Sequence, residues 1–555
     1  MNINVGYANT HKKAFNSIVN YNKENWCDND IHNKQLDMFI EDSQQYKLTL
    51  RKKTLLDDIM KRRLKHNDSN GSKYNLEQIG SVIHEGMSSK KNDVIDKGIC
   101  LLLKYIEEDE NILHSKQKKY LLENIYYSLL DLFKHYDQYR INILHIFISL
   151  TASDEIFISN LMNDNIISYV SPIITNSSTA TDVYYLTLIL LSNCMVDNIS
   201  NYNLITTSFN FGNIIHNLIT TNSLSVTSEY GDVVLIVMSA FLFFLPKQHM
   251  YSKYKAFVDF ILHKKVPHIF NDSYDNDSVD DIIDILVLFS KNRKIVETLI
   301  DNGILYVINR IITELPSYAC KGYLLLSKLL VKCDDVQKQK MFPHAESSLP
   351  LINELMICIS SANAKQNVKL ITNIFHCIRN IMVNSIAYTQ MYFLHKEFLS
   401  FLIELFISNT TPNAIKTEIV ILFIVSMNHN NDNGNNQVQA LLYKSNICKY
   451  VIQYINENYS GKISDVFLYN ALSLIELFLM YGEALSKMKT LTNNNGINYI
   501  KIELDNYNFS RALEMIITSS RDAKLIDKAK SIDIKYWSED KTYYEPIYKM
   551  KLDSH

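Results

Sequence analysis

The chain has 555 residues, of which 47% are hydrophobic and 21% are charged, and its net charge is −3 at pH 7. This length exceeds one ordinary globular core and favours several domains or a repeat array, while only 13 glycines and 8 prolines disfavour a turn-rich β architecture. The nearly balanced charge argues against a general nucleic-acid-binding protein, because such domains are usually basic.

Cysteine spacing and apolar runs indicate the compartment. The eight cysteines are scattered without a Cys-x-x-Cys pair, which is typical of buried intracellular thiols and not of a disulfide or zinc framework. Residues 1–13 are polar and contain no apolar core of a signal peptide. The longest apolar run, 233–246, is shorter than the roughly 18 to 20 residues that span a bilayer, so it predicts a buried core helix. We therefore expect a soluble, intracellular protein without membrane insertion.

The first 75 residues divide into three segments. Residues 1–45 are rich in Asn, Lys and Asp and are expected to form a disordered arm. Residues 46–66 hold two basic clusters, Arg51-Lys52-Lys53 and Lys61-Arg62-Arg63, on either side of a short apolar stretch. This segment is too short and too charged to form a core, which suggests an acidic partner; the alternatives are a solvated face or a nucleic-acid patch. Residues 67–75 predict a flexible linker.

The basic segment resembles a known family. Leu50-Arg51-Lys52, Asp57-Asp58 and Lys61-Arg62-Arg63 are similar, at the same spacing, to the end of the importin-β-binding segment of importin-α. The resemblance implies that this segment folds as a helix inside importin-β, and that Lys61-Arg62-Arg63 otherwise occupies the chain's own cargo groove as an autoinhibitor. The implied importin-β-binding residues are Leu50, Arg51, Lys52, Lys53, Lys61, Arg62 and Arg63. The family usually carries a further arginine cluster upstream, whereas residues 39–45 here are acidic and polar.

From 76 to 527 the pattern is helical. Apolar residues at i, i+3, i+4 and i+7 mark helices of about 10 to 16 residues, separated by short Asn, Asp, Ser or Gly turns. Equivalent points such as His145, Ile189 and Leu235 lie 44 and 46 residues apart. A period of about 40 to 47 residues with two or three helices predicts an all-α armadillo or HEAT solenoid. We expect about ten repeats in a right-handed superhelix, a final capping repeat over 475–519 and a polar tail over 528–555.

The resemblance also places a peptide-binding groove on the third helix of each repeat. In importin-α these helices carry Trp and Asn four residues apart, where Trp stacks on Lys or Arg stems and Asn binds the peptide backbone. The stretch 191–197 resembles the family's Leu-Gly-Asn-Ile-Ala-Gly-Asp, which places Asp197 at the lysine-binding aspartate. The implied major site is His145, Ser149, Ile189, Asn193 and Asp197, and the implied minor site is His376, Asn380, Glu418 and Ile421.

The predicted groove departs from the family because the chain has only Trp26 and Trp537. Each lost cation–π contact removes roughly 0.5 to 2 kcal/mol, for which His145 and His376 could partly substitute by stacking. The alternative interpretation makes Asn193 a local cap or turn residue, His145 and His376 surface histidines, and Glu418 a solvated carboxylate.

The resemblance implies a nuclear import adaptor that shuttles between cytoplasm and nucleus. Its implied partners are importin-β, cargo proteins with nuclear-localisation signals, and an export receptor for recycling. We expect no enzyme, cofactor or metal, since the sequence has no Gly-rich phosphate loop, nucleophile elbow or His-x-x-x-His pair with a third ligand. Two alternatives stay open: an armadillo scaffold that binds an apolar or mixed ligand through Ile189, Leu235 and Ile421, and a HEAT-type structural subunit.

Overall fold

The computed structural model describes residues 75–108, 115–176, 178–221, 231–244, 251–270, 276–360, 367–383, 385–394, 396–427, 436–459, 463–490 and 498–537. Every regular element in these ranges is a helix. The described residues form two compact units, 75–307 and 308–537, with the boundary inside α19 (Ile304–Glu314). The predicted importin-β-binding residues, from Leu50 to Arg63, lie outside the described part of the chain.

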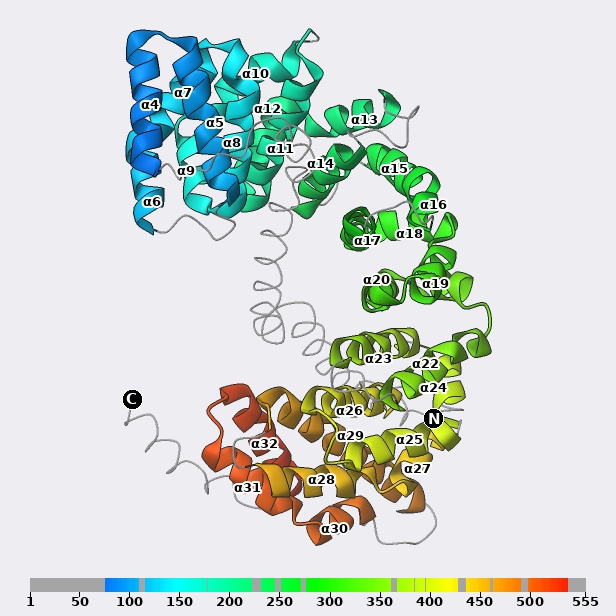
Figure 1. The fold of residues 1–555 in the computed structure, drawn as a ribbon. Helices are drawn as coiled ribbons and strands as arrows, with labels where there is room; N and C mark the ends of the chain where they lie inside the picture. Colours follow the sequence, from blue (N-terminus) through cyan, green and yellow to red (C-terminus); the bar gives the residue numbers. More distant parts are fainter. Residues whose placement is uncertain are drawn as a thin grey trace. The chain divides into compact units, whose positions relative to one another are not determined.

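In the N-terminal unit, long helices follow one another, each packed against the next (Figure 1). These third helices of the repeats are α5 (Asn92–Glu108), α8 (Arg140–Ser153), α11 (Thr181–Asp197), α14 (Gly231–Phe243) and α17 (Asn276–Phe289). The other helices of this unit are α4 (Leu76–Ser89), α6 (Ser115–Tyr120), η1 (Leu121–Ile125), α7 (Tyr126–His135), η2 (Asp137–Tyr139), α9 (Glu155–Asn163), α10 (Ile166–Thr175), α12 (Ile199–Phe209), α13 (Phe211–Thr221), α15 (Tyr251–Phe260), η4 (Ile261–Lys265), α16 (Val266–Ile269) and α18 (Arg293–Asp301). The apolar run predicted as a core helix is α14, which is buried from Val233 to Leu242.

The C-terminal unit repeats this arrangement. Its third helices are α20 (Ala319–Lys332), α23 (Val368–Met382), α26 (Asn413–Met427), α29 (Asp465–Thr490) and α32 (Ala523–Tyr536), and each packs against the next. The intervening helices are η5 (Pro316–Tyr318), α21 (Asp335–Met341), η6 (Ala345–Ser348), α22 (Leu349–Ser360), α24 (Ile386–Leu394), α25 (Lys396–Ile407), α27 (Asn436–Lys444), α28 (Ile447–Asn458), α30 (Tyr499–Asn506) and α31 (Phe509–Ser519).

A left-handed residue recurs at the turn between the first two helices of a repeat. Asn165, Asn210, Asn446 and Asn508 have φ between 46° and 60°, and Gly303 has φ 79°. Each stands directly before a second helix, namely α10, α13, α28, α31 and α19 respectively. Asn and Gly adopt this backbone region at lower cost than other residues. The recurring Asn or Gly therefore sets the same helix-to-helix turn in several repeats.

The last repeat extends beyond the predicted end of the solenoid. The helix α32 runs to Tyr536, past the predicted boundary at 527, and buries Leu525, Ala529 and Ile532. The ammonium of Lys528 pairs with the carboxylate of Glu476 on α29. The final repeat is thus α30, α31 and α32, and the segment predicted as a cap begins within the preceding third helix.

One described helical stretch, Asp465–Ser486 of α29, is long and apolar enough to cross a membrane. Its side chains Phe467, Leu472 and Phe478 are fully buried, and α29 packs against α26 on one side and α32 on the other. A helix that is apolar on most sides is buried in this way in the core of a large protein. In this structure α29 is therefore a core helix of the last repeats.

Candidate functional site

The structure places every predicted groove residue on a third helix. His145 and Ser149 lie on α8, Ile189, Asn193 and Asp197 on α11, His376 and Asn380 on α23, and Glu418 and Ile421 on α26. The helical register predicted from the sequence is consistent with these positions. The structure differs from the implied peptide-binding groove in the groups that these side chains contact. These contacts determine which of the residues a ligand can reach.

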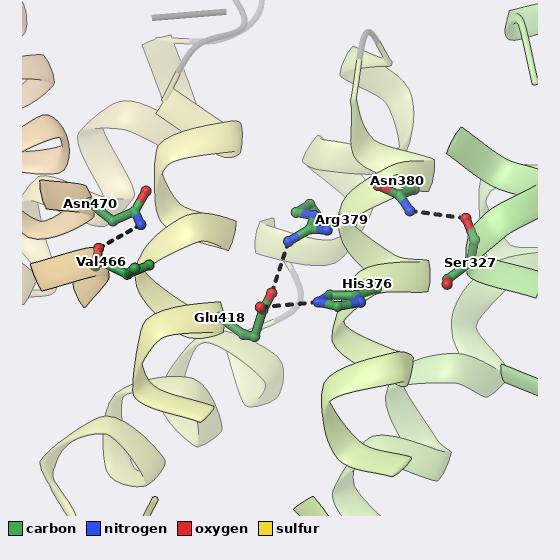
Figure 2. Close-up of polar contacts among 7 residues, drawn as sticks. All are labelled: Ser327, His376, Arg379, Asn380, Glu418, Val466 and Asn470. Carbon is green, nitrogen blue, oxygen red and sulfur yellow. Dashed lines mark hydrogen bonds and ion pairs between the residues drawn. The ribbon is translucent and has the colours of Figure 1, made fainter. Parts of the chain in front are cut away.

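The predicted peptide-binding asparagines join neighbouring third helices. Asn193 is 2% exposed, and its Nδ2 donates to the Ile148 carbonyl at 3.3 Å and to Thr151 Oγ1 at 3.1 Å, both on α8. Asn380 is 7% exposed, and its Nδ2 donates to the Ser327 carbonyl on α20 at 3.2 Å (Figure 2). These bonds span about one repeat, so Asn193 is not the local cap or turn residue of the alternative interpretation, and Asn380 likewise joins two helices.

Three such contacts set the register of α23 on α20. Asn373 Nδ2 donates to the Cys320 carbonyl at 3.0 Å, and Cys377 Sγ donates to the Tyr323 carbonyl at 3.3 Å. The Asn380 bond continues the series one turn further along both helices. On α29, the third helix after α26, Asn470 Nδ2 instead donates to the Val466 carbonyl of its own helix, at 2.8 Å (Figure 2).

Asp197 ends α11 at a turn that uses its carboxylate. Its Oδ2 accepts from Asn198 Nδ2 at 2.6 Å and from Asn201 Nδ2 at 3.3 Å. Asn198 also caps α12 by accepting from the Asn201 backbone N–H at 2.8 Å. A ligand lysine at Asp197 would therefore compete with two amide groups that belong to the α11–α12 turn.

Several predicted groove side chains are buried. His145 is 3% exposed, so its interpretation as a surface histidine is wrong. Ile189, Leu235 and Ile421 are also buried, and a groove lined by them, as in the scaffold alternative, is not at the surface of this structure. Of the residues predicted for the major site, Ser149 and Asp197 keep partial exposure.

A charged cluster connects α23 and α26 (Figure 2). Glu418 Oε1 lies 3.1 Å from His376 Nε2, and Glu418 Oε2 lies 3.0 Å from Arg379 Nη1. Glu418 is only 8% exposed, so its interpretation as a solvated carboxylate is wrong. The His376 side chain keeps 20% exposure and faces this carboxylate. Burial acts to raise the pKa of Glu418, but the charges of His376 and Arg379 outweigh it and lower the pKa below its usual value.

Basic residues gather on α20 and α23, and we call this set the α20–α23 basic face. It consists of Lys321, Lys328, Lys332, Lys369 and Arg379. Neither of the two helices contains an Asp or Glu. Although Lys328 has exposed surface, desolvation of its ammonium and the charges of Arg379 and Lys332 lower its pKa. These lysines are not among the predicted site residues, although the spacing i, i+7 and i+11 of the three on α20 is visible in the sequence.

No family model and no curated protein matches this chain. Among solved structures, an engineered protein, Northeast Structural Genomics Consortium target OR497, matches with a TM-score of 0.54 and 10% identity over 83% of this chain and 99% of that one. The chain is an all-α repeat solenoid. Its three-helix repeats have the armadillo form that the sequence period predicts.

Two other structures are similar at lower TM-scores. A designed armadillo repeat protein in complex with the peptide (KR)4 matches at 16% identity and a TM-score of 0.36, over 49% of this chain and all of that one. The UNC-45 chaperone, described as binding and folding muscle myosin, matches at 11% identity and a TM-score of 0.34, and the chain spans about half of it (52%). Within the part of the chain that is described, no group of three or more His, Cys, Asp or Glu side chains could hold a metal ion.

Proposed function

We propose that this chain is a protein-interaction scaffold whose third helices hold an extended segment of a partner protein. The observation that carries the proposal is the row of charged side chains on consecutive third helices of the C-terminal unit. Lys328, Arg379 and Glu418 lie on α20, α23 and α26, which pack in sequence. Stacked repeats offer extended surfaces of this kind for binding, and no single repeat is needed to form a closed pocket.

The contacts of the groove carboxylates favour a ligand other than a basic nuclear-localisation signal. Glu418 is held by His376 and Arg379, and Asp197 by Asn198 and Asn201. A ligand lysine at Glu418 would have to replace Arg379 in a buried charge pair, and breaking such a pair costs about 3 to 5 kcal/mol. At Asp197 it would compete with the two amide groups. We therefore propose that the scaffold binds a partner segment whose recognition does not depend on lysines at Glu418 and Asp197.

The test is to measure hydrogen–deuterium exchange of the full chain with a panel of acidic, basic and apolar extended peptides. The scaffold function predicts that at least one peptide slows exchange in α20, α23 or α26, because an ordered ligand covers their exposed side chains. Protection confined to other helices, or protection by no peptide at any concentration up to about 1 mM, would contradict the proposal.

A second candidate function is that of a nuclear import adaptor that shuttles between cytoplasm and nucleus. The observation that favours it is the order of the sequence, in which Arg51-Lys52-Lys53 and Lys61-Arg62-Arg63 precede a repeat solenoid. In this proposal the basic segment binds importin-β. Until importin-β binds, the tethered segment competes with cargo for the groove at an effective concentration in the millimolar range.

Titration of the full chain with importin-β at physiological salt tests the adaptor function. Sub-micromolar binding that is lost in Arg51→Ala with Lys52→Ala is the expected result. The matched control is Lys12→Ala with Lys13→Ala, which removes two positive charges elsewhere in the N-terminal arm. Equal capture of wild type and both variants, or no capture at all, would rule out this second candidate and leave the scaffold function standing.

A further inference from the structure

We infer that His376 accepts a hydrogen bond from the backbone of the bound segment, and that protonation of its ring releases that segment. The inference rests on the proposed scaffold function. It specifies the group that the ligand presents to α23 and the condition under which binding is lost. Glu418 has a positioning role, because it determines which ring nitrogen of His376 carries the proton.

His376 lies on the side of α23 that a ligand can reach. The residues that keep exposure at i, i+3, i+7, i+10 and i+14 of this helix are Lys369, Thr372, His376, Arg379 and Val383. This spacing places them in one stripe along the helix, and His376 is in the middle of it. The described elements α20, α22, α24 and α26 pack against other sides of α23.

Glu418 fixes the tautomer of the neutral ring. His376 Nε2 lies 3.1 Å from Glu418 Oε1. Burial acts to raise the pKa of Glu418, but the charges of His376 and Arg379 lower it below its usual value, so at neutral pH the carboxylate only accepts hydrogen bonds. Nε2 must therefore carry the proton, and in the neutral imidazole this leaves Nδ1 as an acceptor.

The second nitrogen of the ring is available to a ligand. Within the described residues, the bond to Glu418 is the one hydrogen bond that the His376 ring makes. Nδ1 is not among the fully buried side-chain nitrogens there that lack a partner, so part of the 20% exposure of this side chain belongs to it. The ring thus presents an oriented acceptor on the open side of α23.

A neutral acceptor selects its ligand by the donors that the ligand carries. Carboxylate and phosphate oxygens without a proton only accept hydrogen bonds, so an acidic side chain or a nucleic-acid backbone has no group for Nδ1. An extended polypeptide presents a backbone N–H at each residue other than proline. The backbone of a partner protein is therefore the ligand that fits this position.

The neighbouring third helix adds an apolar contact. Leu324, which is partly exposed on α20, is at the same level as His376. The bond from Cys377 Sγ to the Tyr323 carbonyl, 3.3 Å long, joins the residues next to them. Axes of packed helices lie about 8 to 10 Å apart, a distance that an extended chain covers in about three residues. We therefore expect an apolar side chain about three positions from the donating N–H.

Protonation reverses the role of Nδ1. Histidine is the side chain that ordinarily changes charge between about pH 5 and pH 8, and the protonated ring carries N–H on both nitrogens. The backbone N–H of the ligand would then face a second donor. Binding should therefore weaken as the pH falls through the titration of His376, while Glu418, whose pKa is lowered, stays ionised.

The charged surroundings of His376 are defined on each packed helix. Among the described residues, Glu418 is the titratable group that contacts its ring. The other titratable groups of these helices interact with one another or with backbone carbonyls: Lys369 and Lys321 with Cys320, Lys328 and Lys332 with each other and with Arg379, Glu354 and Cys358 with Tyr323, Lys416 with the Phe406 carbonyl, Tyr388 with the Phe342 carbonyl and Tyr392 with the Ser348 carbonyl.

The first experiment measures binding of a rhodamine-labelled (Leu-Ser-Thr)4 peptide to the full chain by fluorescence anisotropy. This peptide has no charged side chain and places an apolar residue at every third position. At about pH 8, wild type should bind it about fivefold more tightly than His376→Phe, which corresponds to one hydrogen bond. At about pH 5.5 wild type should lose this advantage, whereas His376→Phe should bind equally at both pH values within about twofold.

The matched control is His344→Phe, which makes the same substitution at an exposed histidine of the C-terminal unit. It should keep the affinity and the pH dependence of wild type. Circular dichroism of each variant at both pH values shows that the chain is folded under the conditions of the assay.

Modification of the peptide tests the same bond without altering the protein. Three counterparts carry a backbone N-methyl group on every Leu, on every Ser or on every Thr, so each lacks one class of N–H. One of them should bind wild type about fivefold more weakly than the other two do. This difference should disappear in His376→Phe, because the coupling requires both partners of the bond.

Nuclear magnetic resonance of the full chain with 15N-labelled histidine tests the tautomer itself. The His376 signals, identified by their absence in His376→Phe, should show a protonated Nε2 and an unprotonated Nδ1 at about pH 8. Glu418→Gln should show both tautomers, because a glutamine amide can donate as well as accept.

Failure of the inference and failure of the scaffold function are distinguishable. A protonated Nδ1 in wild type at about pH 8, equal pH dependence of wild type and His376→Phe, or no binding of (Leu-Ser-Thr)4 up to about 1 mM would overturn the role of His376. Binding that strengthens at the lower pH would make Nδ1 a donor and also overturn it. If a peptide of the exchange panel then still protects α20, α23 or α26, the scaffold function stands; if none does, both fail.

Discussion

At the scale of single residues, Glu418 pairs with Arg379 and contacts His376, both on the neighbouring helix α23, in a buried position. Its removal in Glu418→Ala would leave the Arg379 guanidinium without its carboxylate, and we expect the free energy of unfolding to fall by about 3 to 5 kcal/mol. Glu418→Met with Arg379→Met should recover most of this loss, because both charges are then absent. Urea denaturation at pH 7 measures both variants, and a loss below about 1 kcal/mol in Glu418→Ala would contradict the prediction.

The lowered pKa of Glu418 also gives a pH dependence with a defined sign. A carboxyl group whose folded pKa is below its unfolded value of about 4.3 stabilises the fold fully above that value. The contribution is lost as the pH falls through the folded pKa, because protonation breaks the pairs with His376 and Arg379. Between pH 6 and pH 3, wild type should therefore lose stability more steeply than Glu418→Gln. Parallel curves for the two proteins would show that Glu418 is not coupled to folding.

Lys416 presents the opposite case, a cation buried against aromatic rings. Its Nζ donates to the Phe406 carbonyl and lies 4.5 Å from the ring centroid of Tyr454 and 5.3 Å from that of Phe406. Burial lowers its pKa, so the unfolded chain binds the proton more readily and stability should rise as pH increases through the folded pKa. Lys416→Met keeps the volume without the charge and should remove this rise, whereas a rise of equal size in both proteins would exclude Lys416 as its source.

At the scale of helices, the buried asparagines determine how one third helix sits on the next. Asn193→Ala removes both donations from α11 to α8, and we expect a loss of about 1 to 3 kcal/mol in the free energy of unfolding. Asn160 donates only to the Ile156 carbonyl of its own helix, so Asn160→Ala is a matched control that should change stability little. If Asn193 were a ligand clamp alone, its substitution would weaken peptide binding and leave urea denaturation unchanged.

These asparagines also show what the sequence could predict. The motif around Asn193 placed it correctly on a third helix, because spacing along one helix follows from its own periodicity. Its partner, Thr151, is 42 residues away, and the rotation of α8 that brings the two together depends on packing across the whole repeat. The same limit applies to Glu418, whose partners lie on a different helix, while the lysines of α20 needed only the sequence of that helix.

At the scale of the whole molecule, the sequence period predicted the solenoid, and left-handed Asn or Gly residues give the first two helices of several repeats the same turn. The prediction failed at the end of the chain. There, the buried apolar residues of α32 form a narrow stripe, Leu525, Ala529 and Ile532, among Lys and Asp residues. Such a helix resembles a polar tail in sequence. Its burial depends on α29 and α31, which cover one side of it, and this packing cannot be predicted from the sequence of α32 alone.

The terminal helix is therefore expected to act as the cap of the C-terminal unit. A chain ending at residue 521 would expose the faces of α29 and α31 that pack on α32, and would leave Glu476 without Lys528. Burial of Leu525 and Ile532 contributes about 1.5 to 3 kcal/mol each, so the shortened chain should unfold at a lower temperature. It should also self-associate, because an uncapped repeat exposes apolar surface. A chain ending at residue 540 keeps α32 and is the control; melting temperatures and light-scattering masses that agree between the two chains would show that α32 is not the cap.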